Sequence, residues 1–280
     1  MSQPIAHPFD TVAADYDPGF TRRRLGRWLR AAVWEWLADA FRLGDRVLEL
    51  GCGTGEDAIW LARRGVQVVA TDAAPRMLAV AQRKAAAAGV ADRIVFERLD
   101  LSTLGDRRLE ISAESISNLR SPISTPYDGA FSNFGALNCL PDRRPLAEAL
   151  ARWVRPGGRV VLVVMGPLCP WELAWYLLHG APRTAFRRLR PGGIEAHIGT
   201  GATVRVWYPS PRRLRAEFVP GFRHLETAGI GAFLPPSYLD HLVERWPPLF
   251  EALAHLDRRF ARTFPWTWLN DHYLAVFERR

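Results

Sequence analysis

Residues 47–55, VLELGCGTG, constrain the fold of this chain more than any other stretch. A short apolar run is followed by glycines at positions 51, 53 and 55, and then by residues with helical spacing. Glycine tolerates backbone angles and close approaches that a Cβ forbids. The pattern therefore predicts a buried strand that ends in a tight turn, where a ligand can touch main-chain N–H groups. Such a turn is typical of nucleotide-binding proteins, and the glycines alone leave the nucleotide open.

Segments with the spacing of strands and of helices alternate around this turn. Residues 21–41 carry apolar side chains at helical spacing and predict an amphipathic helix that leads into the first strand. The alternation that follows predicts a parallel sheet built from right-handed crossovers. We expect strands at residues 46–50, 66–72, 94–100, 127–134 and 159–165, and helices at about 56–64, 75–89 and 145–154.

The alternation of strands and helices is interrupted twice. Residues 105–126 are rich in serine and lack sustained periodicity, so we expect a surface insertion there. Residues 167–208 have a different, aromatic-rich composition, which indicates an inserted cap. The chain then returns to the sheet at 222–233, continues as a long helix at 237–262, and ends in a strand, HYLAVFER.

The composition argues against several classes of protein. The net charge is +8, but only Lys84 among the 37 basic residues is a lysine. The arginine excess therefore indicates a coding bias, and we expect no nucleic-acid partner. Cys52, Cys139 and Cys169 have neither CxxC spacing nor a histidine cluster nearby, so we expect no disulfide framework and no metal site. The start has no signal-peptide pattern and no apolar run is long enough to span a membrane, so we expect a cytoplasmic protein.

Acidic residues near the glycines distinguish between two nucleotide ligands. Ligands of open α/β sheets lie beyond the carboxyl ends of the strands, where Asp72 can bind both ribose hydroxyls and Asp100 an adenine amine. A dinucleotide pyrophosphate prefers GxGxxG and a helix N-terminus free of negative charge. This chain has GxGxG, with Glu49 before it and Glu56 and Asp57 after it. These carboxylates favour a ligand with a cationic ammonium and sulfonium, S-adenosylmethionine, over NAD.

Five segments resemble those of class I S-adenosylmethionine-dependent methyltransferases of the small-molecule type. They are VLELGCGTG (47–55), VVATDAAPRML (68–78), LDL (99–101), YDGAFSNFGALNCL (127–140) and LARWVRPGGRVVLVV (150–164). The resemblance implies a doubly wound, mostly parallel seven-stranded Rossmann-like α/β sheet with an antiparallel last strand. The opening FDTVAADYD resembles the segment that folds over the cofactor in many of these enzymes. The expected units are an N-terminal lid and helix (1–44), a cofactor-binding core (45–166), the cap (167–208) and the C-terminal completion of the sheet (209–280).

The same resemblance implies the residues that surround the cofactor. The glycines would flank its amino-acid part, Asp72 would hold the ribose, and Asp100 the adenine amine. The other contacts would include Met77 and Leu101 on the adenine and the side chains that cover the methionine moiety. The complete expected set is Phe9, Tyr16, Arg30, Glu49, Gly51, Cys52, Gly53, Gly55, Asp72, Ala73, Met77, Asp100, Leu101, Ser132, Asn133 and Phe134.

The methyl acceptor should lie against the segments that cap the same edge of the sheet. Residues 167–208 leave from that edge, and their aromatic side chains predict a hydrophobic or aromatic acceptor. With an antiparallel last strand, as the resemblance implies, His272 also lies at this edge and is the candidate general base. The aromatic side chains could equally close a small core of the cap itself. The expected acceptor contacts are Trp171, Trp175, Tyr176 and Tyr208.

The sequence thus predicts a methyltransferase that acts on an O or N of a hydrophobic or aromatic small molecule. The chain lacks the Asn/Asp-Pro-Pro-aromatic and Pro-Cys signatures that resemble nucleic-acid base methyltransferases. Two alternatives stay open. One is a lipid or quinone methyltransferase at the membrane surface, since residues 183–190, RTAFRRLR, could dock on anionic headgroups. The other is a non-catalytic, S-adenosylmethionine-binding regulatory subunit. These patterns do not fix the oligomeric state.

Overall fold

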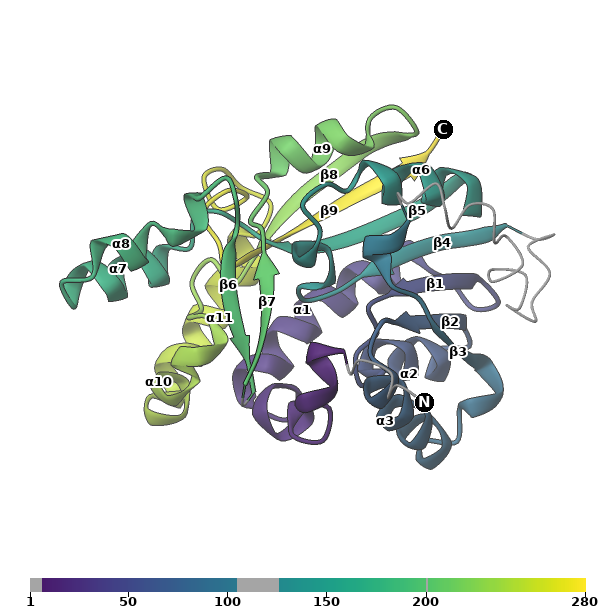
Figure 1. Ribbon diagram of the computed structural model, residues 1–280, viewed down its shortest axis with the longest axis horizontal. Helices are drawn as coiled ribbons and strands as arrows, with labels where there is room; N and C mark the ends of the chain where they lie inside the picture. Colours follow the sequence, from purple (N-terminus) through teal and green to yellow (C-terminus); the bar gives the residue numbers. More distant parts are fainter. Residues whose placement is uncertain (1–6, 105–125, 200) are drawn as a thin grey trace.

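A seven-stranded sheet forms the centre of the molecule (Figure 1). The computed structural model describes residues 7–104, 126–199 and 201–280. The strand order is β3-β2-β1-β4-β5-β9-β8, and only β9 runs antiparallel to its neighbours. This confirms the predicted mostly parallel sheet. The strands are β1 (Arg46–Leu50), β2 (Gln67–Asp72), β3 (Ile94–Arg98), β4 (Tyr127–Ser132), β5 (Val154–Met165), β8 (Phe222–Ile230) and β9 (His272–Arg279).

Helices cover both faces of this sheet. Successive residues of a strand point to opposite faces, so Val47 packs into one buried cluster and Leu48 into the other. The face of Val47 is covered by α1 (Arg24–Ala40), α2 (Glu56–Arg63), α3 (Pro75–Ala87), α10 (Asp240–Arg245) and α11 (Pro247–Phe260). The face of Leu48 is covered by α6 (Arg144–Trp153) and α9 (Pro211–Phe218). The central strands are therefore buried on both sides, as a doubly wound sheet requires.

The cap consists of two parts that leave the sheet in different directions (Figure 1). The first contains α7 (Pro170–Leu178), α8 (Pro182–Ala185) and the short 3₁₀ helix η6 (Arg187–Leu189), which extend away from the sheet. The second is an antiparallel hairpin of β6 (Ile194–Ile198) and β7 (Ala202–Val206), separate from the main sheet. The hairpin lies against the N-terminal 3₁₀ helix η1 (Pro8–Thr11). It is this second part that closes over the carboxyl edge of the sheet.

Three details differ from the sequence-based expectations. The predicted continuous helix at 237–262 is wrong, because Pro247 disfavours the α region for the preceding Trp246, and the chain divides there into α10 and α11. The strand predicted at 159–165 begins earlier, since β5 starts at Val154, which pairs with Tyr127 across an irregularity in the ladder. Helix α9 was not predicted. The expected insertion at 105–126 lies almost wholly outside the described residues.

No helix among the described residues is both long and apolar enough to cross a bilayer.

Candidate active site

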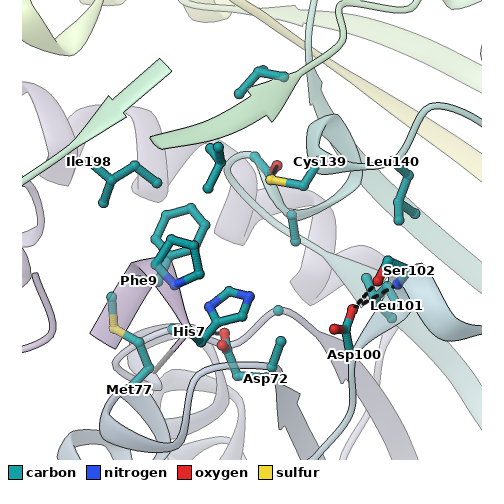
Figure 2. A pocket seen from close by; sticks show the side chains of 18 of the residues that line it. His7, Phe9, Asp72, Met77, Asp100, Leu101, Ser102, Cys139, Leu140 and Ile198 are labelled. Carbon is teal, nitrogen blue, oxygen red and sulfur yellow. Dashed lines mark hydrogen bonds between the residues drawn. The ribbon is translucent and has the colours of Figure 1, made fainter. Parts of the chain in front are cut away.

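A cavity of about 560 Å³ lies at the carboxyl edge of the parallel strands. Figure 2 shows Asp72 and Asp100 on one side of it, Cys139 and Ile198 on the other, and His7 and Phe9 reaching in between. Its walls come from the loops after β1 to β4, from the N-terminal segment and from the β6–β7 hairpin. Its size falls within the range of cavities that enclose small ligands.

The three glycines after β1 are required for two different structural reasons. All have φ between +53° and +76°, which side chains rarely adopt. A Cβ on Gly51 would lie 2.3 Å from the Cβ of Ala136, and one on Gly55 would lie 2.7 Å from the Cβ of Ala81. A Cβ on Gly53 would meet no atom within 4 Å, and Gly53 lines the cavity. The space beside Gly53 is therefore available to a ligand, whereas the other two glycines allow close packing of the loop.

Asp72 holds this glycine loop in place from the end of β2. The backbone N–H of Gly53 donates to Asp72 Oδ2, and that of Ala74 donates to Asp72 Oδ1, each at 2.8 Å. Burial raises the pKa of Asp72, while these two hydrogen bonds oppose the shift. Each carboxylate oxygen has a second lone pair, so the side chain can still accept two hydrogen bonds from a ligand in the cavity.

Asp100 and Met77 lie on the same side of the cavity as Asp72 (Figure 2). Asp100 caps a short 3₁₀ turn, since its Oδ1 accepts from the backbone N–H and the hydroxyl of Ser102. Its other carboxylate oxygen has no hydrogen-bond partner among the described residues and can accept from a ligand amine. Met77 is buried beside Ala13 and Ala74, and Leu101 also lines the cavity. Together they offer two apolar contacts beside one acceptor, which suits a purine ring.

A buried charge cluster lies below the glycine loop. Asp57 accepts hydrogen bonds from Arg30, from Trp34 Nε1 at 2.7 Å and from Asn133 Nδ2 at 3.0 Å. Glu49 is only 1% exposed, and its Oε2 has no hydrogen-bond partner in the part of the chain that the structure describes. Burial and the nearby Asp57 raise the pKa of Glu49 well above its ordinary value, although Arg30 opposes the shift. A buried carboxylate with an unused oxygen is costly unless a donor arrives, so the cluster suits a cationic ligand group.

The N-terminal segment is fastened over this loop by hydrogen bonds and ion pairs. Asp17 accepts from Thr54 Oγ1 at 2.6 Å and from Lys84 Nζ at 2.7 Å, and Lys84 also binds Glu56 at 2.8 Å. Nearer the N-terminus, Asp10 accepts a hydrogen bond from the backbone N–H of Arg76 at the start of α3. The only lysine of the chain thus ties the segment to both α2 and α3. This holds Phe9 and Tyr16 against the cavity.

The β6–β7 hairpin forms the opposite wall of the cavity. Along both strands half-buried and exposed residues alternate, and the inward side chains are Ala196, Ile198, Val204 and Val206. Asn138, which is fully buried, fastens the end of the hairpin to the sheet. Its side chain donates to the carbonyls of Trp207 and Met165 and accepts from the backbone N–H of Met165. The hairpin therefore presents a small aliphatic surface across from Gly53.

The four predicted acceptor residues do not line this cavity, and two of them, Tyr176 and Tyr208, lie beside a buried ion-pair network. Arg188 binds Glu172 at 2.8 Å and Asp271 at 2.7 Å, and its guanidinium lies 5.0 Å from the ring of Tyr208. Tyr176 lies 5.4 Å from the guanidinium of Arg187. The indole N–H of Trp171 donates to the carbonyl of Phe233, and Trp175 stacks on His179. Their role in acceptor binding stays a prediction.

His272 lies close to the cavity but does not line it. Its Nδ1 lies 3.0 Å from the carboxylate of Asp271, and its ring packs edge-on against Phe134, with centroids 5.3 Å apart. Phe134 lines the cavity and has φ 45°, which is the one positive φ among the non-glycine residues of the described part. His272 is therefore one side chain away from the cavity. Cys139 does line it, but burial raises the pKa of its thiol to about 11, so it stays protonated at neutral pH.

Comparison with known proteins decides the family. Residues 48–160 match the model of a methyltransferase domain. A demethylmenaquinone methyltransferase from Deinococcus radiodurans is 31% identical over 76% of this chain and 81% of that protein. The chain is an S-adenosylmethionine-dependent methyltransferase. It is also 26% identical to the tRNA 5-carboxymethoxyuridine methyltransferase of Escherichia coli, over 97% of this chain and 95% of that protein. The solved structure of the CcbJ methyltransferase from Streptomyces caelestis has a similar fold, with a TM-score of 0.60, 18% identity and 99% coverage of both chains.

The residues of this methyltransferase fit its cofactor. Gly53 leaves room beside its backbone, Asp72 has two unused lone pairs for ribose hydroxyls, and Asp100 has a carboxylate oxygen available for the adenine amine. Of the expected cofactor residues, the structure brings ten to the cavity: Phe9, Tyr16, Gly51, Gly53, Asp72, Ala73, Met77, Asp100, Leu101 and Phe134.

The other six expected cofactor residues do not line the cavity. Ser132 donates its hydroxyl to the carbonyl of Leu50, Cys52 is buried, and Gly55 precedes α2. Arg30, Glu49 and Asn133 belong to the buried charge cluster. The sequence reasoning missed His7, Asn138 and the aliphatic hairpin. The alternation in IEAHI and ATVRV on either side of glycines 199 and 201 was the signal that could have revealed the hairpin.

Proposed function

We propose that this methyltransferase transfers the methyl group of S-adenosylmethionine to an O or N of a hydrophobic or aromatic small molecule. One observation carries the proposal: a single cavity has the Asp72 and Gly53 wall on one side and the aliphatic hairpin face on the other. An acceptor against Ile198 and Val204 would lie across from the glycine loop, with apolar surface around it.

The chain's part in this reaction is to align the reactants and exclude water. S-adenosylmethionine, when bound, supplies a methyl group that its sulfonium has already activated. Asp72 would fix the ribose, and the glycine loop would orient the amino-acid end. The N-terminal segment and the hairpin would close the cavity, since both contact one another over it. Such positioning contributes much of the rate of a one-step displacement, because reactants held in contact need no further loss of entropy.

His272 is the proposed general base for an acceptor hydroxyl or amine. Its Nδ1 faces the Asp271 carboxylate, which would leave Nε2 to take the proton. Arg188 binds the same carboxylate and would hold it in place. Because the ring packs against Phe134, a small movement of that side chain would connect His272 with the cavity.

The proposal is tested with a panel of acceptors and a matched pair of variants. Purified enzyme and methyl-labelled cofactor are incubated with phenols, aromatic amines, aliphatic alcohols and unmodified tRNA, and products are identified by mass. Ile198→Glu places a charge on the inward face of β6, whereas His197→Glu places it on the exposed face one residue away. We expect Ile198→Glu to abolish acceptor turnover with little change in cofactor affinity, and His197→Glu to leave both unchanged. Equal activity of both variants, or methylation of tRNA alone, would contradict the proposal.

A lipid or quinone acceptor is the second candidate. The relative from Deinococcus radiodurans, named a demethylmenaquinone methyltransferase, favours it, because the similarity covers most of both chains. The ring of a quinone acceptor would pack against the same aliphatic side chains of the β6–β7 hairpin. Including a demethylated naphthoquinone in the panel separates the two candidates, since methylation at a ring carbon would replace the O or N assignment.

A further inference from the structure

The first part of the cap carries an unusual group of exposed apolar side chains. We define the cap arm as α7, α8, η6 and the following Arg190, residues 170–190, and Figure 1 shows its helices extending away from the sheet. Leu178 is 84% exposed, and Leu177, Phe186 and Leu189 are each about half exposed. Single exposed leucines are common, but four large apolar residues within 13 positions of one projecting element indicate a contact surface.

The charge of the cap arm indicates what kind of partner it can bind. Residues 173–193 contain four arginines and no acidic residue. The nearest carboxylate, Glu172, is buried and already binds Arg187 and Arg188. Arg183 and Arg190 are exposed, and neither forms an ion pair within the described ranges. The arm therefore presents a positive surface beside its apolar side chains, and the partner should be anionic.

A basic groove connects the cap arm with the active site. Arg183, Arg187 and Arg190 line a groove of about 570 Å³ together with residues of the hairpin, among them Arg205 and Glu195. Glu195 lies 3.4 Å from Arg205 and offsets part of that charge. Arg205 also lines the cofactor cavity. The positive surface of the arm thus continues to the mouth of the cavity.

We propose that the cap arm docks on an anionic lipid bilayer. Its leucines and Phe186 enter the boundary between headgroups and acyl chains, and its exposed arginines bind lipid phosphates, as amphipathic surface elements do. A second copy of the chain fits this surface poorly, because two arms would bring the exposed Arg183 and Arg190 of each copy together. Nucleic acid also fits less well, because the most exposed side chain of the arm, Leu178, is aliphatic and offers no stacking surface for a base. Docking places the mouth of the cavity near the bilayer, whatever atom the enzyme methylates, so the inference goes beyond the proposed function.

Vesicle flotation of the full chain tests this proposal. We expect the enzyme to float with vesicles that contain about 30% phosphatidylglycerol, and not with pure phosphatidylcholine vesicles, since each arginine near an anionic surface strengthens binding about fivefold. The double variant Arg183→Ala/Arg190→Ala should lower the partition coefficient about thirtyfold. Its control is Arg212→Ala/Arg215→Ala, which removes the same charge from the exposed surface of α9.

A second pair of variants separates apolar insertion from charge alone. Leu178→Ser should lower the partition coefficient about tenfold or more, because the side chain no longer transfers from water to the bilayer. Leu43→Ser is the control, since Leu43 is 81% exposed and lies in the turn before β1, away from the arm. Unchanged affinity for S-adenosylhomocysteine shows that each variant is folded.

Three results would overturn the docking proposal. They are absence of flotation with either vesicle, equal losses in the arm variants and their controls, and a dimer in sedimentation velocity that Leu178→Ser dissociates. Vesicle binding needs no acceptor, so the outcome is independent of the proposed reaction. An enzyme that methylates soluble acceptors and ignores vesicles would refute docking and leave the reaction standing.

Discussion

Replacing Asp72 by alanine should weaken cofactor binding by about 1–3 kcal/mol, or about 5- to 150-fold in Kd. The structure explains this range. Both carboxylate oxygens already accept a backbone N–H at 2.8 Å, which orders the glycine loop, and both have a lone pair left for the ribose. A hydrogen bond to a charged acceptor contributes about 1.5–3 kcal/mol. The buried carboxylate also carries a desolvation cost that its removal relieves, which keeps the net loss near the size of one such bond.

The assay is calorimetric titration with S-adenosylhomocysteine at neutral pH. Asp72→Asn is a useful second variant, because the amide keeps one acceptor oxygen and should lose less affinity than alanine. Asp92→Ala is the control, since that side chain is 76% exposed and lies before β3. Wild-type affinity in Asp72→Ala would refute the assignment of the ribose to this carboxylate.

Three further predictions concern other parts of the site. Gly53→Val should abolish cofactor binding in a calorimetric titration while the circular dichroism spectrum stays that of wild type, because the new side chain would occupy cavity space at φ 53°; retained affinity would show that the loop does not approach the ligand. The raised pKa of Glu49 means that the folded protein holds a proton that the unfolded chain releases, so the free energy of unfolding should fall as pH rises from the ordinary glutamate pKa to the raised one. Urea titrations across this range should show a flatter profile for Glu49→Gln, and an identical profile would contradict the assignment. His272→Ala should lower the rate about 10²–10⁴-fold if the imidazole is the base, with a smaller deficit for acceptors of lower pKa; the same deficit for all acceptors would identify a packing role behind Phe134.

The sequence predicted the parts of the fold in which local pattern and tertiary structure agree. The strand at 46–50 and the helix that begins at residue 56 were predicted with the bounds of β1 and the start of α2, because apolar periodicity and glycine punctuation both mark them. The break at Trp246 was missed although the two prolines after it are a local signal. The pairing of Val154 with Tyr127 could not be predicted, since that ladder depends on a partner far away in the sequence.

The candidate site shows the same division. Gly53, Asp72 and Asp100 were found because strand ends meet at one edge of a parallel sheet. The cap residues that face the cavity were harder to predict, because an aromatic-rich composition does not show which way the side chains point. Trp171 donates to the carbonyl of Phe233 and Tyr208 lies beside Arg188, whereas the aliphatic residues of the hairpin reach the cavity. Only the topology, in which the hairpin folds back over the N-terminal segment, decides between them.

We expect one cavity, between the glycine loop and the hairpin, to hold the cofactor with its sulfonium methyl group toward the acceptor. A crystal structure of the complex with S-adenosylhomocysteine tests it most directly. We expect ribose hydroxyls within hydrogen-bond distance of Asp72, the adenine between Met77 and Leu101, and the sulfur facing the side of the cavity formed by Ile198 and Val204. A ligand bound elsewhere, or bound here with its sulfur turned away from the hairpin, would contradict it.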